Sequence, residues 1–455
     1  MEMLWTYLNK FVDYFFPEGS VRRIIIKTIN LGLIKNNKMR LIFEQEHQDY
    51  LDLVEYTRNL EEHTRNLFEK SYEKSIDYVP FGKTDFMLYE NDPKLIAFYL
   101  PQFHPIPEND QFFGKSFTEW TNTTRAVPLF KGHYQPRLPD ELGFYDTRFK
   151  HVLKRQIEIA KEYGIYGFCF HHYWFSGKPV LRVPYNHILS NPDLDIPFCL
   201  NWANESWTVR WDGFDSEDGI LLRQDHSADD DIAFIKDIEP ALRDRRYIRI
   251  NGRPLLLIYR PGRFSDMRAT VDRWNDYLTN RGVGQLFLAE MQTNFENILN
   301  PTTNIVEGID PQKYSFDAAV EYPPHGYILL NVKNSMELFY NHFSGEILKY
   351  EDIIDKSLQR KTTSYPLFRG IFPGWDCTPR RKNPIIYINS TPEIYKNWLD
   401  GIIAYTKKNL PSDKQFIFIN SWNEWAEGAY LEPDRRYGFA YLNATRRSLL
   451  DARKD

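Results

Sequence analysis

The chain has 455 residues, of which 42% are hydrophobic, 16% aromatic and 26% charged, a composition that excludes a disordered or fibrous protein. Its net charge is −5, but residues 1–40 carry 7 Lys and Arg against 3 Asp and Glu, so the rest of the chain is acidic. An acidic body argues against nucleic acid as the main partner.

Aromatic residues are unusually frequent, with 11 Trp, 29 Tyr and 32 Phe, and many stand beside polar residues in short clusters. This pattern is typical of clefts that stack aromatic rings on sugars, although a large aromatic core explains part of it. The three cysteines, Cys169, Cys199 and Cys377, have no zinc-site spacing and no disulfide framework, which suits a reducing compartment.

Residues 1–90 are predicted to be a basic, mainly helical segment that precedes the main domain. Ser20 is a candidate helix N-cap, and residues 21–40 mix aliphatic residues with Lys and Arg, as interfacial helices do. This helix either contacts an anionic membrane or packs on the protein's own body. No stretch has the roughly 18 apolar residues of a spanning helix, and residues 1–16 lack the basic start of a secretory signal. We expect a cytoplasmic protein, with contact at the inner face of the cell membrane through residues 1–40 as an alternative.

From residue 91 to 455, short apolar runs recur between helical patterns. The predicted strands are Leu95–Leu100, Gly164–Phe170, Ile196–Leu200, Pro254–Tyr259, Leu286–Ala289, Phe316–Val320, Leu367–Phe372 and Phe416–Ile419. The clearest predicted helices are Arg148–Tyr163, Ile232–Leu242, Met267–Leu278, Glu393–Lys408 and Phe439–Leu450. Eight buried runs separated by helices predict an α/β fold, a (β/α)8 TIM-type barrel. A doubly wound sheet is the alternative, but its glycine fingerprint is absent, since Gly282 and Gly284 precede a strand.

The last strand is followed by the segment Ser421–Gly428, which holds Glu424 and Glu427 three residues apart. If the chain turns helically here, both carboxyl groups share one face. Cleavage of a glycosidic bond needs two carboxyl groups, and two in one cleft separate their pKa values. We therefore predict that Glu424 and Glu427 are catalytic. The alternative is a solvent-facing turn with two ordinary surface glutamates.

A second polar segment, Asn201–Trp207, follows the third strand and adds the carboxylate Glu205. Asn amides suit sugar hydroxyls, although the asparagines could also cap and the tryptophans pack in the core. His171 and His172 are adjacent on a strand, so they point to opposite faces, and we predict that one faces the pocket while the other packs. We predict no metal site and no cofactor.

The remaining candidates also lie at strand ends. Arg380 and Arg381 either bind a phosphate or acidic sugar or pair with Asp376. The acidic strings 212–218 and 229–231 are weak candidates for a metal-binding motif, and the second is predicted to be a solvated helix start. The full predicted substrate-binding set is Tyr99, Gln102, His104, Glu119, Trp120, His171, His172, Tyr173, Trp174, Asn201, Trp202, Asn204, Glu205, Trp207, Glu290, Trp375, Asp376, Arg380, Asn420, Trp422, Asn423 and Trp425.

Residues 94–445 resemble the WbsX-type glycosyltransferases that accompany surface-polysaccharide assembly, which are similar in turn to the glycoside hydrolase family 99 domain. The matching segments are FYLPQFHPIPEND, FTEWTN, YGFCFHHYWFSGK, NWANESW, FPGWDCTPRR and SWNEWAEG. The resemblance implies a metal-independent barrel in which Glu424 assists attack by the sugar's own 2-hydroxyl and Glu427 is the acid/base. That route retains configuration through an epoxide-like intermediate.

These observations predict a carbohydrate-active enzyme of O-antigen or capsule biosynthesis that cleaves or transfers at a glycosidic bond of an oligosaccharide or lipid-linked glycan. Three alternatives remain: a noncatalytic glycan-binding barrel, a nucleotide-sugar-dependent glycosyltransferase and a metal-dependent hydrolase.

Overall fold

The computed structural model describes residues 74–454, apart from 209–218, 294–297, 301–304 and 340–342. Its centre is a ring of eight parallel strands that closes where the first strand pairs with both the second and the last. In order around the ring, the strands are β1 (Lys94–Tyr99), β2 (Gly167–Phe175), β4 (Phe198–Trp202), β8 (Arg253–Ile258), β9 (Phe287–Gln292), β12 (Ala318–Glu321), β14 (Leu367–Ile371) and β16 (Phe416–Ile419). The predicted (β/α)8 barrel is confirmed.

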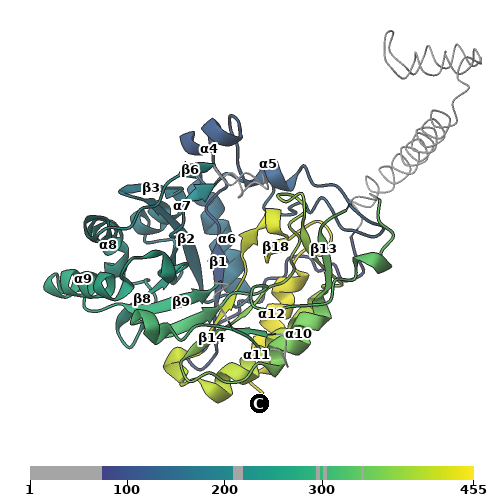
Figure 1. Cartoon of the computed structure of the whole chain (residues 1–455). Helices are drawn as coiled ribbons and strands as arrows, with labels where there is room; N and C mark the ends of the chain where they lie inside the picture. Colours follow the sequence, from purple (N-terminus) through teal and green to yellow (C-terminus); the bar gives the residue numbers. More distant parts are fainter. Residues whose placement is uncertain (1–73, 209–218, 294–297, 301–304, 340–342, 455) are drawn as a thin grey trace, which may run out of the picture. The chain divides into compact units, whose positions relative to one another are not determined.

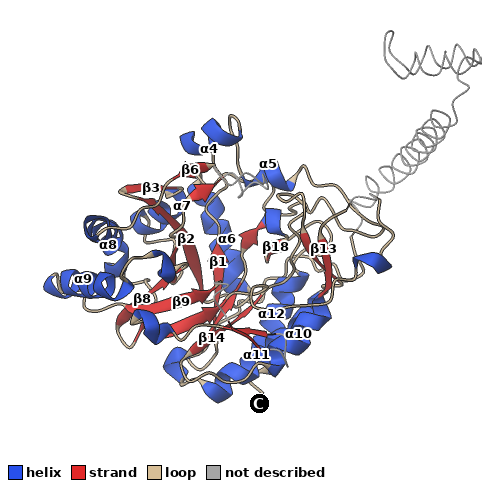
Figure 2. Ribbon diagram, in the orientation of Figure 1, coloured by secondary structure: helices blue, strands red, loops and turns tan. Residues whose placement is uncertain are grey.

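Helices connect successive strands and lie outside the ring (Figures 1 and 2). They are α6 (Lys150–Glu162), α7 (Val183–Ser190), α8 (Ala228–Arg243), α9 (Met267–Asn280), α10 (Tyr350–Gln359), α11 (Pro392–Asn409) and α12 (Ala440–Asp451). Between β9 and β12 the described residues contain a 3-10 turn, η3 (Pro311–Tyr314), in place of an α-helix. All five predicted helices occur, with ends that differ by a few residues.

Smaller elements decorate the barrel. Those between β1 and β8 are α4 (Pro107–Phe113), α5 (Glu119–Thr123), β3 (Lys178–Val180), β5 (Trp207–Thr208), β6 (Ile220–Leu222) and β7 (Arg249–Ile250). The later ones are η2 (Pro261–Arg263), β10 (Ile298–Asn300), β11 (Ile305–Glu307), η4 (Lys333–Ser335), β13 (Glu346–Lys349), β15 (Ile385–Ile388), η5 (Ser412–Lys414), β17 (Asn423–Glu424), η6 (Trp425–Glu427) and β18 (Ala429–Tyr430).

The second strand differs from its prediction at both ends. It begins at Gly167 because Gly164, with φ +85°, still belongs to the turn after α6. It continues to Phe175, past the predicted end at Phe170, because its last residues pair with the antiparallel strand β3. His171 and Tyr173 are therefore strand residues and not loop residues.

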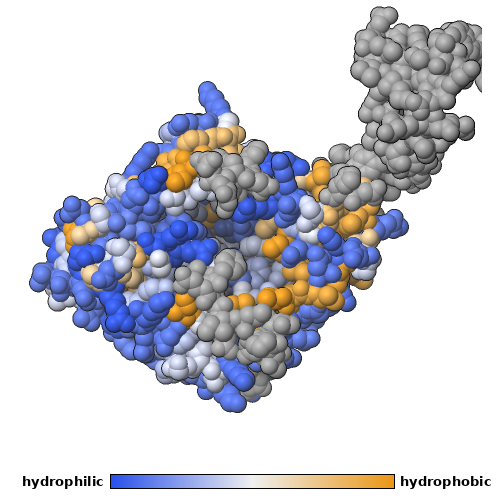
Figure 3. Space-filling model, in the orientation of Figure 1, coloured by the Kyte–Doolittle hydropathy of each residue, from blue (hydrophilic) through white to orange (hydrophobic). Residues whose placement is uncertain are grey.

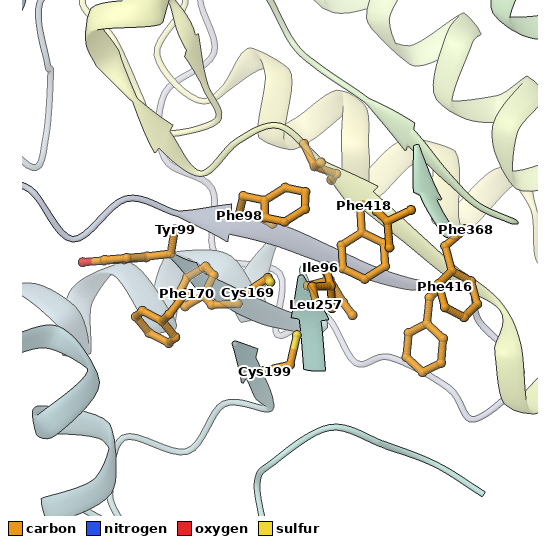
Figure 4. Packing of buried hydrophobic residues seen from close by; sticks show 14 of the residues in the cluster. Ile96, Phe98, Tyr99, Cys169, Phe170, Cys199, Leu257, Phe368, Phe416 and Phe418 are labelled. Atoms are coloured by element: carbon orange, nitrogen blue, oxygen red, sulfur yellow. The ribbon is translucent and has the colours of Figure 1, made fainter. Parts of the chain in front are cut away.

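Alternate residues of each strand point into and out of the ring. The register pairs Cys169 with Cys199 and Asn201 with Leu257, and residues paired in this way point to the same side. Figure 4 shows Cys169, Cys199, Leu257 and Ile96 converging inside the barrel. By contrast, Tyr99 packs against Phe170 with ring centroids 4.8 Å apart, and both point away from the centre.

Residues 74–90 pack on the barrel. The Val79 amide donates to the Tyr437 carbonyl (3.1 Å) and the Phe439 amide donates to the Val79 carbonyl (2.7 Å). This described part of the predicted helical segment contains no helix. The predicted helix and membrane contact of residues 1–40 lie outside the described residues, and the boundary at residue 90 stays a prediction. Within the described chain, no helix is both long enough and apolar enough to cross a bilayer.

A buried ion pair joins the outer side of the barrel to its helices. Arg369 Nε lies 2.6 Å from Glu321 Oε2, and both side chains are 1% exposed. Arg360 Nη1 contacts the other oxygen at 2.9 Å. Burial by itself would raise the pKa of Glu321, but the two arginines hold it at about 2.

We expect Arg369→Met to lower the free energy of unfolding by about 3–5 kcal/mol, because it leaves Glu321 buried with half of its compensating charge. Denaturant titration followed by tryptophan fluorescence measures this loss. Since the pKa of Glu321 is depressed, the stabilisation is present above about pH 4.5 and is lost as the pH falls toward 2, so the difference between the two proteins should shrink in acid.

The matched control is Arg447→Met, which removes an ion pair with Glu393 whose side chains are 47% and 62% exposed. We expect a change below about 1 kcal/mol for this exposed pair. Equal losses in the two variants would contradict the role given to the buried pair.

Candidate active site

A cavity of about 580 Å³ opens at the carboxyl ends of the barrel strands, where the loops after each strand meet. The space-filling view is hollowed near the middle of the face shown, between mostly hydrophilic residues (Figure 3). The predicted residues that line the cavity are His171, Tyr173, Glu205, Trp207, Trp375, Arg380, Glu424 and Glu427. Residues from four different barrel strand ends therefore reach one pocket.

The two predicted catalytic carboxyl groups lie on the loop after β16. Glu424 ends β17, and the 3-10 turn η6 carries the chain to Glu427, so both side chains line the same cavity. Their placement together in the pocket agrees with the expected helical turn, and their catalytic roles stay a prediction. Gly428 follows with φ +62°, and a Cβ there would lie 2.9 Å from the Asp376 backbone nitrogen, so the close approach of these two segments needs glycine.

Glu424 lies in a buried, negatively charged environment. Burial raises the pKa of Glu424 well above its usual value, and the nearby carboxylates Glu427 and Glu119 raise it further, against the opposing effect of Arg380. The amide of Glu424 donates to Ser421 Oγ (2.8 Å), which holds the start of the turn. Glu424 is therefore suited to carry a proton near neutral pH.

Glu427 has a different partner. Arg380 forms an ion pair with it through Nη1, and the Arg380 and Glu427 side chains are 8% and 17% exposed. Of the two alternatives for Arg380, the pairing with Asp376 does not occur, because Asp376 is buried behind the cavity and accepts hydrogen bonds from Gln135 (2.8 Å) and the His133 ring (2.7 Å). The two carboxyl groups of the pair thus stand in distinct electrostatic settings.

His171 faces Glu424 from the barrel side. Its Nδ1 accepts a hydrogen bond from Asn201 Nδ2 (3.0 Å), which leaves the proton of the neutral ring on Nε2, 4.0 Å from Glu424 Oε1. Burial lowers the pKa of His171 to about 4, so the ring is neutral at pH 7. Phe98 stacks on the ring at 5.5 Å and forms the floor beneath it.

Aromatic rings make up much of the wall. Tyr173 and Trp207 meet edge to face with centroids 5.3 Å apart, and Trp375, Tyr259 and Tyr322 complete the set. Glu424 and Glu427 both act electrostatically on Tyr173 and on Tyr322. Carboxyl groups and aromatic faces therefore share one space.

Several predicted site residues brace the pocket instead of lining it. The Glu119 carboxylate accepts from the Ala426 amide (2.8 Å), and Asn423 bonds both the amide and the carbonyl of Leu100. Asn204 bonds the backbone of Arg260 in the same two-sided way. Trp425, stacked on Tyr430 at 3.9 Å and packed on Trp120, donates to Glu432, and Asn420 donates to the Pro323 carbonyl.

Other predicted residues do not line the cavity, and those on barrel strands point outward because strand side chains alternate. Tyr99 donates to Gln156, His172 lies 3.7 Å from Asp237, and Trp174 donates to Asp230. Trp202 stacks on Phe234 at 3.8 Å, Trp422 packs on Phe168, and Glu290 occupies an outward position of β9. Gln102 is fully buried, and His104 bonds Thr147 (2.7 Å). These side chains are not among the residues that line this cavity, and their contact with substrate stays a prediction.

The structure also adds residues that were not among the predicted set. Three of them, Tyr259, Arg260 and Tyr322, lie at the ends of predicted strands. Their position at these ends was the sequence signal that could have identified them as pocket residues. His325 comes four residues after its strand, directly after a Pro-Pro pair that periodicity does not resolve. Burial lowers the pKa of His325, which keeps this ring neutral as well.

The acidic strings have structural roles where they are described. Asp229, Asp230 and Asp231 lie in the first turn of α8 as predicted. Asp229 is exposed, but Asp230 and Asp231 are buried, with Asp231 accepting from Thr270 (2.8 Å). Residues 212–218 lie outside the described chain. Among the described residues, no cluster of three or more His, Cys, Asp or Glu is arranged to hold a metal.

Comparison with known proteins shows which family the chain belongs to. The model of the glycosyltransferase WbsX family matches residues 95–445. The uncharacterized protein WxcX from two strains of Xanthomonas campestris pv. campestris is 41% identical over 430 residues, covering 94% of this chain. The chain spans 59% of the length of these relatives.

Two solved structures are similar in fold. A glycoside hydrolase-like protein has a TM-score of 0.50 at 16% identity, over 84% of this chain and 98% of its own. The GH99 endo-alpha-mannosidase from Bacteroides thetaiotaomicron has a TM-score of 0.47 at 14% identity, over 81% and 99%. The family match over three quarters of the sequence is decisive: the chain belongs to the WbsX glycosyltransferase family.

Proposed function

We propose that this protein is an enzyme that cleaves or transfers at a glycosidic bond, with Glu424 and Glu427 as its paired carboxyl groups. The observation that carries the proposal is their meeting in one aromatic-walled cavity of about 580 Å³, one buried beside other carboxylates and the other paired with Arg380. Glycosidic chemistry needs two carboxyl groups that differ in protonation, and such a difference in environment supplies it.

The aromatic walls and neutral histidines suit a sugar substrate. The rings of Trp207, Trp375 and Tyr173 offer faces for stacking, and His171 Nε2–H is a donor directed toward the carboxyl pair. A neutral ring can donate to a hydroxyl without adding a positive charge. We propose that His171 positions the sugar hydroxyl nearest to Glu424.

The proton of the free pair is expected on Glu424, because its pKa is raised while Glu427 contacts Arg380. The family resemblance implies the opposite arrangement during catalysis, with Glu427 as the acid at the leaving oxygen and Glu424 as the base at the 2-hydroxyl. We propose that bound sugar takes the place of Arg380 against Glu427, which lets the proton move to Glu427 and leaves Glu424 as a carboxylate.

The donor is proposed to be an oligosaccharide or lipid-linked glycan of surface-polysaccharide biosynthesis, such as O-antigen or capsule, handled in the cytoplasm or at the inner face of the membrane. A nucleotide-sugar donor would need a diphosphate site, for which Arg380 is the candidate, and Arg380 contacts Glu427 in the free cavity. Residues 1–40, with their excess of Lys and Arg, would bring the enzyme to anionic lipid. Whether water or a sugar hydroxyl accepts the glycosyl group decides between hydrolysis and transfer.

Incubation with lipid-linked and free oligosaccharides, with and without nucleotide sugars, followed by mass spectrometry of the products, tests the reaction class. We expect products without any nucleotide sugar and unchanged activity after treatment with a chelator. A strict requirement for a nucleotide sugar would overturn the proposed donor. Binding of glycans with no product in any mixture would favour the noncatalytic barrel.

We expect Glu424→Gln and Glu427→Gln each to lower kcat by at least about 10²-fold, since each removes a group that transfers a proton in the reaction. The matched control is Glu205→Gln, which changes a carboxylate of the same cavity that pairs with Arg260 at 3.4 Å. We expect this variant to alter KM while kcat stays within about tenfold. A kcat loss that is equal in all three variants would argue against a dedicated pair.

Leaving-group dependence separates the two roles. An aryl glycoside with an acidic phenol needs no proton on its leaving oxygen, so we expect Glu427→Gln to recover most of the wild-type rate with this substrate and little with an alkyl glycoside. Glu424→Gln should be impaired with both substrates. If Glu424→Gln recovers instead, the two glutamates exchange roles.

A further inference from the structure

A second cavity, of about 430 Å³, lies on the other side of the wall that carries the catalytic loop. Three pairs of neighbouring residues form this wall, with one member facing each cavity. Trp375, Ile385 and Glu427 line the active-site cavity, whereas Gly374, Ile386 and Gly428 line the second one. The second cavity is thus close to the carboxyl pair but separate from it.

The lining of this cavity is rich in tyrosine, and we call it the tyrosine cavity after Tyr134, Tyr387, Tyr430, Tyr437 and Tyr441. Tyr437 meets Tyr134 edge to face at 6.3 Å and Tyr441 at 5.5 Å, so three of the rings form a continuous angled surface. Such a surface offers ring faces and hydroxyl groups together. This is the combination that a saccharide contacts through its C–H faces and its hydroxyls.

Two arginines lie close to the same tyrosine ring, that of Tyr134. The guanidinium of Arg436 lies 4.8 Å from the Tyr134 ring centroid and that of Arg137 lies 5.6 Å from it. Arg436 forms no ion pair with a carboxylate of the described residues. Arg137 donates to the Gly428 carbonyl (3.1 Å) and lies 3.6 Å from Asp376, but its Nε has no hydrogen-bond partner within the described part of the chain.

The single carboxylate of the described lining, Asp434, is already satisfied by the protein. It accepts from the hydroxyls of Tyr430 (2.7 Å) and Tyr134 (3.1 Å) and from the Tyr437 amide (2.6 Å). It therefore leaves the positive charge of Arg436 available to a ligand. The N-terminus of the 18-residue helix α11, which borders the cavity at Thr391, adds a partial positive charge.

We propose that the tyrosine cavity binds an anionic saccharide, with a sugar face on the tyrosine rings and a phosphate or carboxylate on Arg436 and Arg137. The phosphate of a lipid-linked glycan and the carboxylate of an acidic sugar unit provide the same chemistry. This site goes beyond the glycosidic chemistry proposed above, and its occupancy is measurable without any reaction.

Isothermal titration of the full chain with glucose 1-phosphate, glucuronic acid, glucose and inorganic phosphate tests the proposal. We expect at least one of the two anionic sugars to bind ten times more tightly than both glucose and inorganic phosphate. Preference for glucose 1-phosphate points to a lipid-linked phosphoglycan, and preference for glucuronic acid points to an acidic unit of the polymer. Glucose or phosphate binding as tightly as the anionic sugars would overturn the proposal.

Arg436→Gln should remove this preference by weakening the anionic sugar at least tenfold, and Arg436→Lys should restore part of it. The matched control is Arg260→Gln in the active-site cavity, because Arg260 also lies 4.8 Å from a tyrosine ring, that of Tyr259. It should leave the preference intact. A preference that survives Arg436→Gln, or one that Arg260→Gln abolishes, would overturn the assignment, whatever the outcome of the activity assays.

Discussion

The two-residue period of the barrel strands governs how this molecule is built. Each strand sends alternate side chains inward, and in a closed ring the inward residues of all eight strands must share one interior. On β2 the period directs Cys169 into the barrel, His171 to the floor of the cavity and Tyr173 to its wall. It directs His172 and Trp174 to the helices outside, where they meet Asp237 and Asp230. One strand thus supplies the core, the pocket and the packing of the outer layer.

The outer layer holds the barrel rigid around the pocket. On this side lie the ion pairs of Glu321 with Arg369 and Arg360 and the stack of Trp202 on Phe234. The Glu321–Arg369 pair joins the neighbouring strands β12 and β14, and the other two contacts join a strand to residues in or next to the outer helices, so all three hold the strands from which the loops depart. The loop after β16 then needs only local support, from Asn423 at the Leu100 backbone, Glu119 at the Ala426 amide and Glu432 at the Trp425 ring. Burial raises the pKa of Glu432 to about 7, so this support also places an ionisable group behind the loop.

The wall between the two cavities links their proposed roles. Arg137 donates to the Gly428 carbonyl, and the Asp376 amide donates to the Glu427 carbonyl (2.6 Å). Glu427, whose carboxylate is proposed to be catalytic, therefore belongs to a backbone segment that is held from the other side of the wall. A glycan long enough to occupy both cavities would contact this backbone segment from both sides. In this way the unit bound in the tyrosine cavity would help to align the glycosidic bond that is broken.

The amino-acid sequence by itself determined the barrel, because eight buried apolar runs separated by helices have few other ways to pack. It also located the carboxyl pair, since Glu424 and Glu427 are close along the chain and one short turn keeps them together. It could not separate the residues that line the pocket from those that brace it. Trp202, Trp422 and Asp376 stand in the same polar and aromatic clusters as Trp207 and Trp375. The register of the ring turns Trp202 outward, and the fold of the loops after the strands decides where the other four lie.

The tertiary structure alone decided the partner of each charge and the existence of the second cavity. Arg380 forms an ion pair with Glu427, and Asp376 bonds His133 and Gln135, although Asp376 and Arg380 are only four residues apart in the sequence. The tyrosine cavity brings Tyr134 and Tyr437 together from positions about three hundred residues apart. Such contacts depend on how separate loops fold over the barrel mouth, and local propensity and periodicity carry no information about that.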